Sequence, residues 1–107
     1  MATTVQLHAH EETMALVSFT YNPGSIAAAT TAEQTVTVPG VEVGDFVVVE
    51  KPTLTAGVGI VNARVSAINT VAIQWVNATA APVDPGSETY RLLWWRVPRV
   101  LTTLAGF

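Results

Sequence analysis

The sequence predicts a single all-β domain, an antiparallel β-sandwich or jelly-roll-like fold that follows an extended N-terminal arm. Three observations lead to this prediction. Short segments of alternating apolar and polar residues recur about every ten residues along the chain. Turn-forming Pro, Gly and Asn residues separate these segments, which is typical of sandwiches and jelly rolls. No stretch has the length and the periodicity of a long helix.

The most distinct strand patterns lie in the middle of the chain. Residues 46–50 are Phe-Val-Val-Val-Glu, and such an apolar run predicts a strand that is covered on both faces. Residues 60–66 and 70–77 alternate between apolar and polar side chains on either side of Asn69, which predicts a hairpin. The residues expected to face the core in this hairpin are Val61, Ala63, Val65, Val71, Ile73 and Trp75.

Three further segments complete the predicted strands. Residues 14–21, 33–38 and 88–97 alternate as well, so that each is predicted to form a strand. Residues 25–32 contain consecutive alanines between turn residues and β-branched sequence, and we expect a loop or a single helical turn there.

The composition indicates a protein whose surface is covered by neighbouring protein. Half of the residues are hydrophobic. Charged residues make up 12% of the chain, whereas they make up about one-quarter of an average protein. Apolar runs are far shorter than the roughly 20 residues of a membrane-spanning helix, and the start of the chain does not resemble a secretory signal. A net charge of −3 without a basic patch argues against nucleic acid as a partner. The absence of Cys excludes disulfides and thiolate metal sites.

The last predicted strand carries apolar side chains on both faces. One face presents the row Tyr90, Leu92 and Trp94, and the other presents Leu93, Trp95 and Val97. Only one row can belong to the core of a two-layer domain, unless the C-terminal tail covers the other. We interpret one of these faces as a subunit interface, because aromatic residues and Arg are enriched at interfaces. The interface candidates are Tyr90, Leu92, Leu93, Trp94, Trp95, Arg96, Val97 and Arg99.

Residues 1–13 are polar overall and have no clear period. We interpret them as an extended arm that a partner can order, and residues 14–107 as the β-sandwich domain. The candidates for contacts between this arm and a partner are Val5, Leu7, His8 and His10.

Catalytic, metal and cofactor sites are not predicted. No Ser lies in a Gly-x-Ser-x-Gly elbow, and no glycine-rich phosphate loop follows a strand. His8 and His10 would share one side of an extended arm, but a zinc site needs three or four protein ligands. The chain is therefore predicted not to be an enzyme.

Turn-and-strand segments within residues 26–97 add a resemblance to a known class of protein. These segments are residues 33–40, 44–49, 65–71, 81–84 and 90–92. Together they resemble a small β module that is common among structural proteins of tailed bacteriophages. The resemblance implies a capsid decoration (cement) protein, often trimeric, with an arm that reaches over the shell. The implied partners are the major capsid protein and further copies of the chain. The implied location is the surface of the phage head, after synthesis in the host cytoplasm.

An alternative keeps the fold and changes the partner. The chain would then be a tail or fibre-associated β module that binds a host glycan or other virion proteins. Trp75, Trp94 or Trp95 would stack on the sugar in that case, and an aromatic row bordered by polar residues in a groove would favour it.

Overall fold

The computed structural model describes residues 13–96, and this part of the chain consists of six β-strands without a helix. The prediction of an all-β fold is therefore confirmed for this part. It contains no helix that is long and apolar enough to cross a membrane. The strands are β1 (Thr13–Tyr21), β2 (Thr30–Thr37), β3 (Phe46–Glu50), β4 (Val58–Ala67), β5 (Thr70–Asn77) and β6 (Glu88–Arg96).

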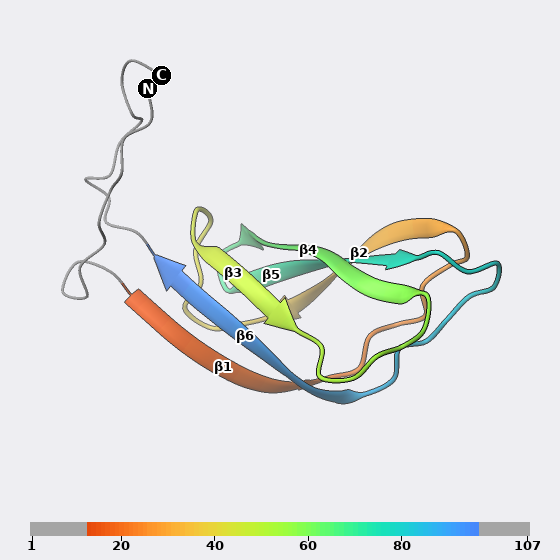
Figure 1. Ribbon diagram of the computed structural model, residues 1–107. Helices are drawn as coiled ribbons and strands as arrows, with labels where there is room; N and C mark the ends of the chain where they lie inside the picture. The colour runs from red at the N-terminus through yellow and green to blue at the C-terminus, as the bar shows by residue number, and fades with distance from the viewer. Residues whose placement is uncertain (1–12, 97–107) are drawn as a thin grey trace, which may run out of the picture.

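The strands form two antiparallel sheets of three strands each, in the orders β1-β6-β3 and β2-β5-β4. Figure 1 shows them as two layers, so the arrangement is sandwich-like. The first and the last strand pair along their whole length, from Thr13 opposite Arg96 to Tyr21 opposite Glu88. Both ends of the described chain therefore lie at the same end of one sheet.

The core lies between the two layers. Val71, Ile73 and Trp75 of β5 are completely buried, which confirms the predicted shared face of this strand. From the opposite sheet, Tyr90 and Leu92 of β6 are also completely buried. The rings of Trp75 and Tyr90 meet edge to face with their centroids 6.4 Å apart. This pair joins the central strands of the two sheets.

One predicted core residue, Val61 of β4, is 55% exposed. The pairing of β4 with β5 shifts between Ile60 and Asn62, so Val61 is an extra residue in a β-bulge. An extra residue reverses the alternation of the side chains, and Val65 beyond the bulge is buried as predicted. The prediction was wrong at Val61 because a bulge leaves no distinct pattern in the sequence.

Two further expectations need correction. Only one face of β3 packs against the core, through Val47 and Val49, and the other face is exposed within the described residues. Residues 25–29 form a loop, one of the two expected alternatives, but β2 already begins at Thr30, within the segment expected to lie outside the strands. Ile26 is held by two backbone hydrogen bonds to Val83, of 2.8 and 3.0 Å, and is completely buried.

Candidate functional site

Four of the eight large apolar side chains that are exposed between residues 13 and 96 lie on one surface, the outer face of the β1-β6-β3 sheet. They are Met14 (63% exposed), Leu16 (64%), Phe46 (52%) and Val48 (55%). Leu93 and Trp95 of the central strand lie between them and are partly exposed. We call this set of six residues the apolar face.

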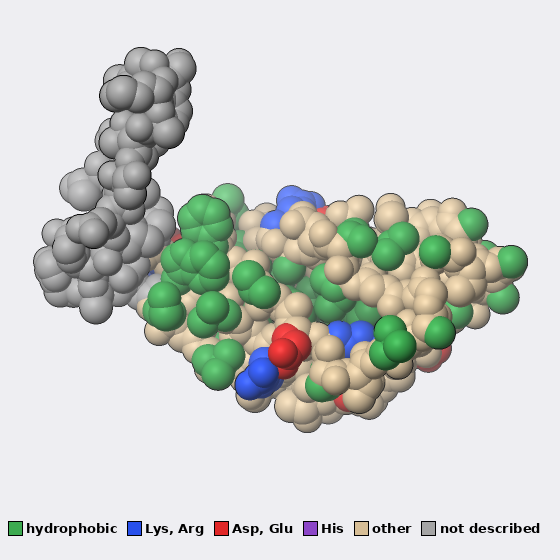
Figure 2. Space-filling model, viewed as in Figure 1, with side chains coloured by type: hydrophobic (Ala, Val, Ile, Leu, Met, Phe, Trp, Pro, Cys, Tyr) green, Lys and Arg blue, Asp and Glu red, His purple; other side chains and the backbone are tan. Residues whose placement is uncertain are grey.

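The register of the strands makes the apolar face continuous. Met14, Trp95 and Phe46 form one row across the sheet. Leu16, Leu93 and Val48 form the next row, two residues further along each strand. Side chains directly opposite each other on neighbouring strands are in contact range. In Figure 2, apolar side chains gather over the start of β3 and the adjoining ends of β1 and β6.

A polar row limits the apolar face on one side. Ser18, Arg91 and Glu50 lie opposite one another, and an ion pair of 2.7 Å joins Arg91 Nη2 to Glu50 Oε1. A shallow hollow of about 270 Å³ lies here, lined by Leu16, Val48, Glu50, Arg91 and Leu93. Typical small-molecule sites are clefts of roughly 300–1,000 Å³. The shallow shape and the apolar rows suit contact with another protein surface better than enclosure of a small ligand.

The structure separates the two predicted rows of β6. Tyr90 and Leu92 are completely buried, so neither side chain offers a surface to a partner. Trp94 packs against the same core. The outward row is therefore that of Leu93 and Trp95, and Val97 and Arg99 lie outside the described residues.

Sequence reasoning missed four members of the apolar face: Met14, Leu16, Phe46 and Val48. Each belongs to a segment correctly predicted as a strand, and the alternation shows that Met14 and Leu16 share a face. What was not visible was that β1 and β3 both pair with β6, which brings the three outward rows together.

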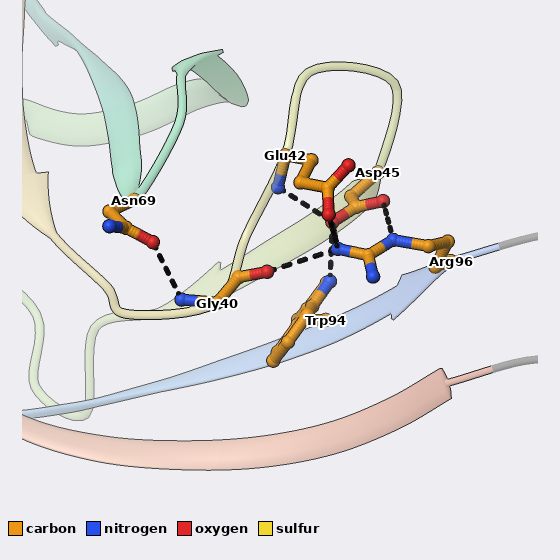
Figure 3. Close-up of polar contacts among 6 residues, drawn as sticks. All are labelled: Gly40, Glu42, Asp45, Asn69, Trp94 and Arg96. Atoms are coloured by element: carbon orange, nitrogen blue, oxygen red, sulfur yellow. Dashed lines mark hydrogen bonds and ion pairs between the residues drawn. The ribbon is translucent and has the colours of Figure 1, made fainter.

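A cluster of polar contacts holds the chain beside the two aromatic residues of the apolar face. Asp45 directly precedes Phe46, and Trp94 and Arg96 flank Trp95 in the sequence. The rings of Phe46 and Trp95 stack with their centroids 5.5 Å apart. The side chains of Asp45, Trp94 and Arg96, which are the sequence neighbours of this pair, meet one another (Figure 3).

The Asp45 carboxylate is the centre of this cluster. It accepts two hydrogen bonds from the Arg96 guanidinium, one from Trp94 Nε1 and one from the backbone N–H of Glu42, each of 2.8 Å. Arg96 Nη2 also donates to the carbonyl of Gly40 at 3.0 Å and lies 3.4 Å from Glu42 Oε2. Its Cζ atom lies 5.6 Å from the centroid of the Trp94 ring. These hydrogen bonds and ion pairs connect the loop between β2 and β3 to the end of β6.

Gly40 fits this loop because its backbone needs a positive φ and lies close to a ring. Its φ is +102°, and a Cβ atom there would lie 2.9 Å from the Trp94 ring. The N–H of Gly40 donates to Asn69 Oδ1 at 2.8 Å. Since Asn69 lies in the turn between β4 and β5, these contacts also connect the loop to the second sheet (Figure 3).

The cluster keeps Asp45 ionised. Burial alone would raise the pKa of this carboxyl. The hydrogen bonds from Arg96, Glu42 and Trp94, together with the charge of Arg96, hold the pKa below its ordinary value. Because the pKa is lower in the folded than in the unfolded chain, ionised Asp45 stabilises the fold at neutral pH. This contribution is lost as the pH falls through the folded pKa.

Asp45→Asn is expected to lower the free energy of unfolding at pH 7 by about 2 kcal/mol, since the two-point contact of Arg96 with a carboxylate is lost. The deficit relative to wild type should begin to shrink below about pH 4, where the carboxyl is protonated in the unfolded chain, and should continue to shrink as the pH falls through the lower pKa of the folded protein. Urea unfolding at a series of pH values measures both effects.

Glu50→Gln is the matched control for this substitution, because Glu50 also pairs with an Arg but its side chain is 54% exposed. Its stability should change by less than about 0.5 kcal/mol. An Asp45→Asn deficit that stays constant down to about pH 2 would contradict the proposed linkage.

The remaining predictions concern the arm, a metal site and the Trp residues of a glycan site. The arm candidates Val5, Leu7, His8 and His10 lie outside the described residues. Within residues 13–96, no three His, Cys, Asp or Glu side chains are grouped to hold a metal ion. Of the three Trp residues considered for a glycan, Trp75 is completely buried and cannot stack on a sugar in this conformation. Trp94 donates a hydrogen bond to Asp45. Of these three residues, Trp95 is the one whose side chain lies on the outer face.

No protein-family model, curated protein or solved structure matches the chain. The resemblance to bacteriophage β modules therefore stays a prediction. The function is inferred from the geometry of the apolar face and from the composition.

Proposed function

We propose that the chain is a non-catalytic structural protein that assembles with other protein through the apolar face. The observation that carries this proposal is the pair of apolar rows across β1, β6 and β3. Soluble monomers rarely expose large contiguous apolar patches, and such patches usually mark interaction sites. The low charged fraction of the chain, 12%, supports the same conclusion.

The proposed assembly is a bacteriophage virion, in which the chain decorates the capsid and binds the lattice of the major capsid protein. This assignment rests on the segments that resemble phage β modules. One of them, residues 44–49, leads into β3 and includes two residues of the apolar face. Another, residues 65–71, includes the turn between β4 and β5. The proposal includes a jelly-roll-like sandwich with an N-terminal arm, self-association as a trimer, and a location on the phage head.

A decoration protein stabilises a shell if it binds the assembled lattice more tightly than free subunits, because binding then shifts the equilibrium toward the intact shell. In this proposal the apolar face joins the copies to one another. A symmetric oligomer then presents its shell contact several times, so that modest individual affinities give tight attachment.

Heads that lack this protein are expected to release DNA at a lower temperature than complete heads, and adding the purified protein back should raise this temperature to that of complete heads. Heating both kinds of head and measuring released DNA tests this. The protein should also sediment with assembled heads and not with unassembled capsid protein. Equal release from both heads would contradict the stabilising role.

The alternative is a tail or fibre-associated module that binds a host glycan or other virion proteins. Trp95 and Phe46 provide exposed aromatic surface. The hollow with Arg91 and Glu50 lies on the same face, beginning at the next row along the strands. Microscopy that locates the protein on the tail would favour this alternative over the decoration of the head.

A further inference from the structure

The edges of the two sheets differ in how they are protected from pairing with other chains. A strand at the edge of a sheet has unpaired N–H and C=O groups on one side. Proteins commonly block such edges with charges, Pro, bulges or short strands. The edge strands in residues 13–96 are β1 and β3 of one sheet and β2 and β4 of the other.

Three of these edges carry protection. β2 has Glu33, which forms an ion pair of 2.8 Å with Arg64 on β4. β4 is further interrupted by two register shifts. β3 is only five residues long, ends at Glu50 and is followed by Lys51 and Pro52.

β1 carries none of these protections. It is nine residues long, without a charged residue, a Pro or a Gly, and it pairs with β6 without a register shift. Figure 1 shows β1 along the border of the molecule, with its outer side away from β6. Met14 and Leu16 on β1 also belong to the apolar face. The edge most suited to accept a further strand therefore adjoins the proposed interface.

The segment that precedes β1 has the pattern of a strand. Residues 1–13 as a whole show no clear period, but residues 5–10 alternate. Val5, Leu7 and Ala9 would lie on one face, with Gln6, His8 and His10 on the other. This length is within the range of the strands of the fold, and Glu11 and Glu12 connect the segment to β1 at Thr13.

Pairing of this segment with β1 of its own chain would need a tight turn just before Thr13. Tight hairpin turns need positive φ values that Gly, Asn and Asp supply. Residues 1–13 contain no Gly, Asn, Asp or Pro, and the residues directly before Thr13 are Glu11 and Glu12. The turn chemistry therefore disfavours folding back within one chain and favours pairing with another copy.

We propose that residues 5–10 of one copy add as a strand to the free edge of β1 in a neighbouring copy. The inference rests on the proposed self-association and specifies how the copies are joined. If each copy donates its segment to the next, the exchange closes a ring, and a ring of three satisfies the proposed trimer. The backbone of β1 supplies the hydrogen bonds, and the apolar face supplies the adjoining contact.

Amide hydrogen exchange of the full-length protein tests this directly. Alternate N–H groups of β1 point toward β6, and the others point to the free edge. In the assembled protein both sets should be protected. Dilution to the monomer should speed exchange of the edge-facing set at least about tenfold and leave the β6-facing set protected. The edge-facing amides of β2 are an internal control and should exchange rapidly at all concentrations.

Each other result overturns the proposal. Protection of the β1 edge that does not change on dilution would show pairing within one chain. An oligomer whose β1 edge exchanges rapidly would overturn strand exchange and leave the apolar face as the interface. A protein that stays monomeric would overturn the proposed self-association as well.

A cross-link provides an independent measurement, because the chain contains no Cys. One population carries a single Cys at one of residues 5–10 in turn, and a second, mass-tagged population carries Ser18→Cys on β1. Oxidation of mixed assemblies should link the two populations for at least one arm position. Thr35→Cys on the β2 edge is the matched control and should give at least about tenfold less product. Equal yields, or no link to Ser18→Cys from any arm position, would overturn the proposal.

Discussion

Val48→Glu is expected to weaken self-association at least 100-fold, about 2.7 kcal/mol, while the fold remains intact. Val48 lies in the middle of β3, opposite Leu93, and is 55% exposed. A carboxylate at this position would lose its hydration when the apolar face is covered, without a basic partner directly opposite it. Glu50, two residues further on the same strand, would add like-charge repulsion.

Leu54→Glu is the control, because Leu54 is also an exposed apolar residue, at 89%, and lies in the connection between β3 and β4, outside the apolar face. Its substitution should leave association unchanged. Sedimentation equilibrium over a range of concentrations compares the two variants. Equal effects, or no loss in Val48→Glu, would contradict the assignment of the apolar face as the interface.

Trp75→Ala is expected to lower the free energy of unfolding by about 3–5 kcal/mol, the usual cost of emptying a buried aromatic site. Trp75 is completely buried and contacts Tyr90 of the opposite sheet, so its loss leaves a cavity between the central strands. For a domain of this size the melting temperature should fall by more than about 12 °C.

Trp95→Ala is the comparison variant, since it removes the same side chain from the outer face. Trp95→Ala should lower the stability of the isolated monomer less than Trp75→Ala does. It should weaken association more. Thermal unfolding at a concentration where the wild type is monomeric separates the two effects. A larger loss of monomer stability in Trp95→Ala than in Trp75→Ala would contradict the assignment of the two faces.

The predictable part of the fold is the part that local pattern determines. The alternation of Val71, Ile73 and Trp75 and the turn at Asn69 predicted the central hairpin, and both are present. The two-sided apolar character of β6 was also visible, because it depends only on the residue type at each position of one strand.

Features that depend on pairing between distant segments were not predictable. The apolar face exists because residues near 14, 46 and 94 are neighbours in one sheet, and no local pattern reports that arrangement. The Asp45 cluster likewise joins a loop to a strand 51 residues further along the chain. Val61 was misplaced for a different reason, since one extra residue in β4 reverses the faces without changing the residue types.

The pairing of β1 with β6 also determines when the protein can form its sheet during synthesis. β1 is the first strand in the described chain, and its partner ends at Arg96. β3 also pairs with β6, so neither outer strand has its neighbour until that last strand has left the ribosome. Such distant pairing slows folding, because the long intervening chain must form a closed loop before β1 and β6 can pair. A chain that ends before β6 would therefore lack the continuous apolar face.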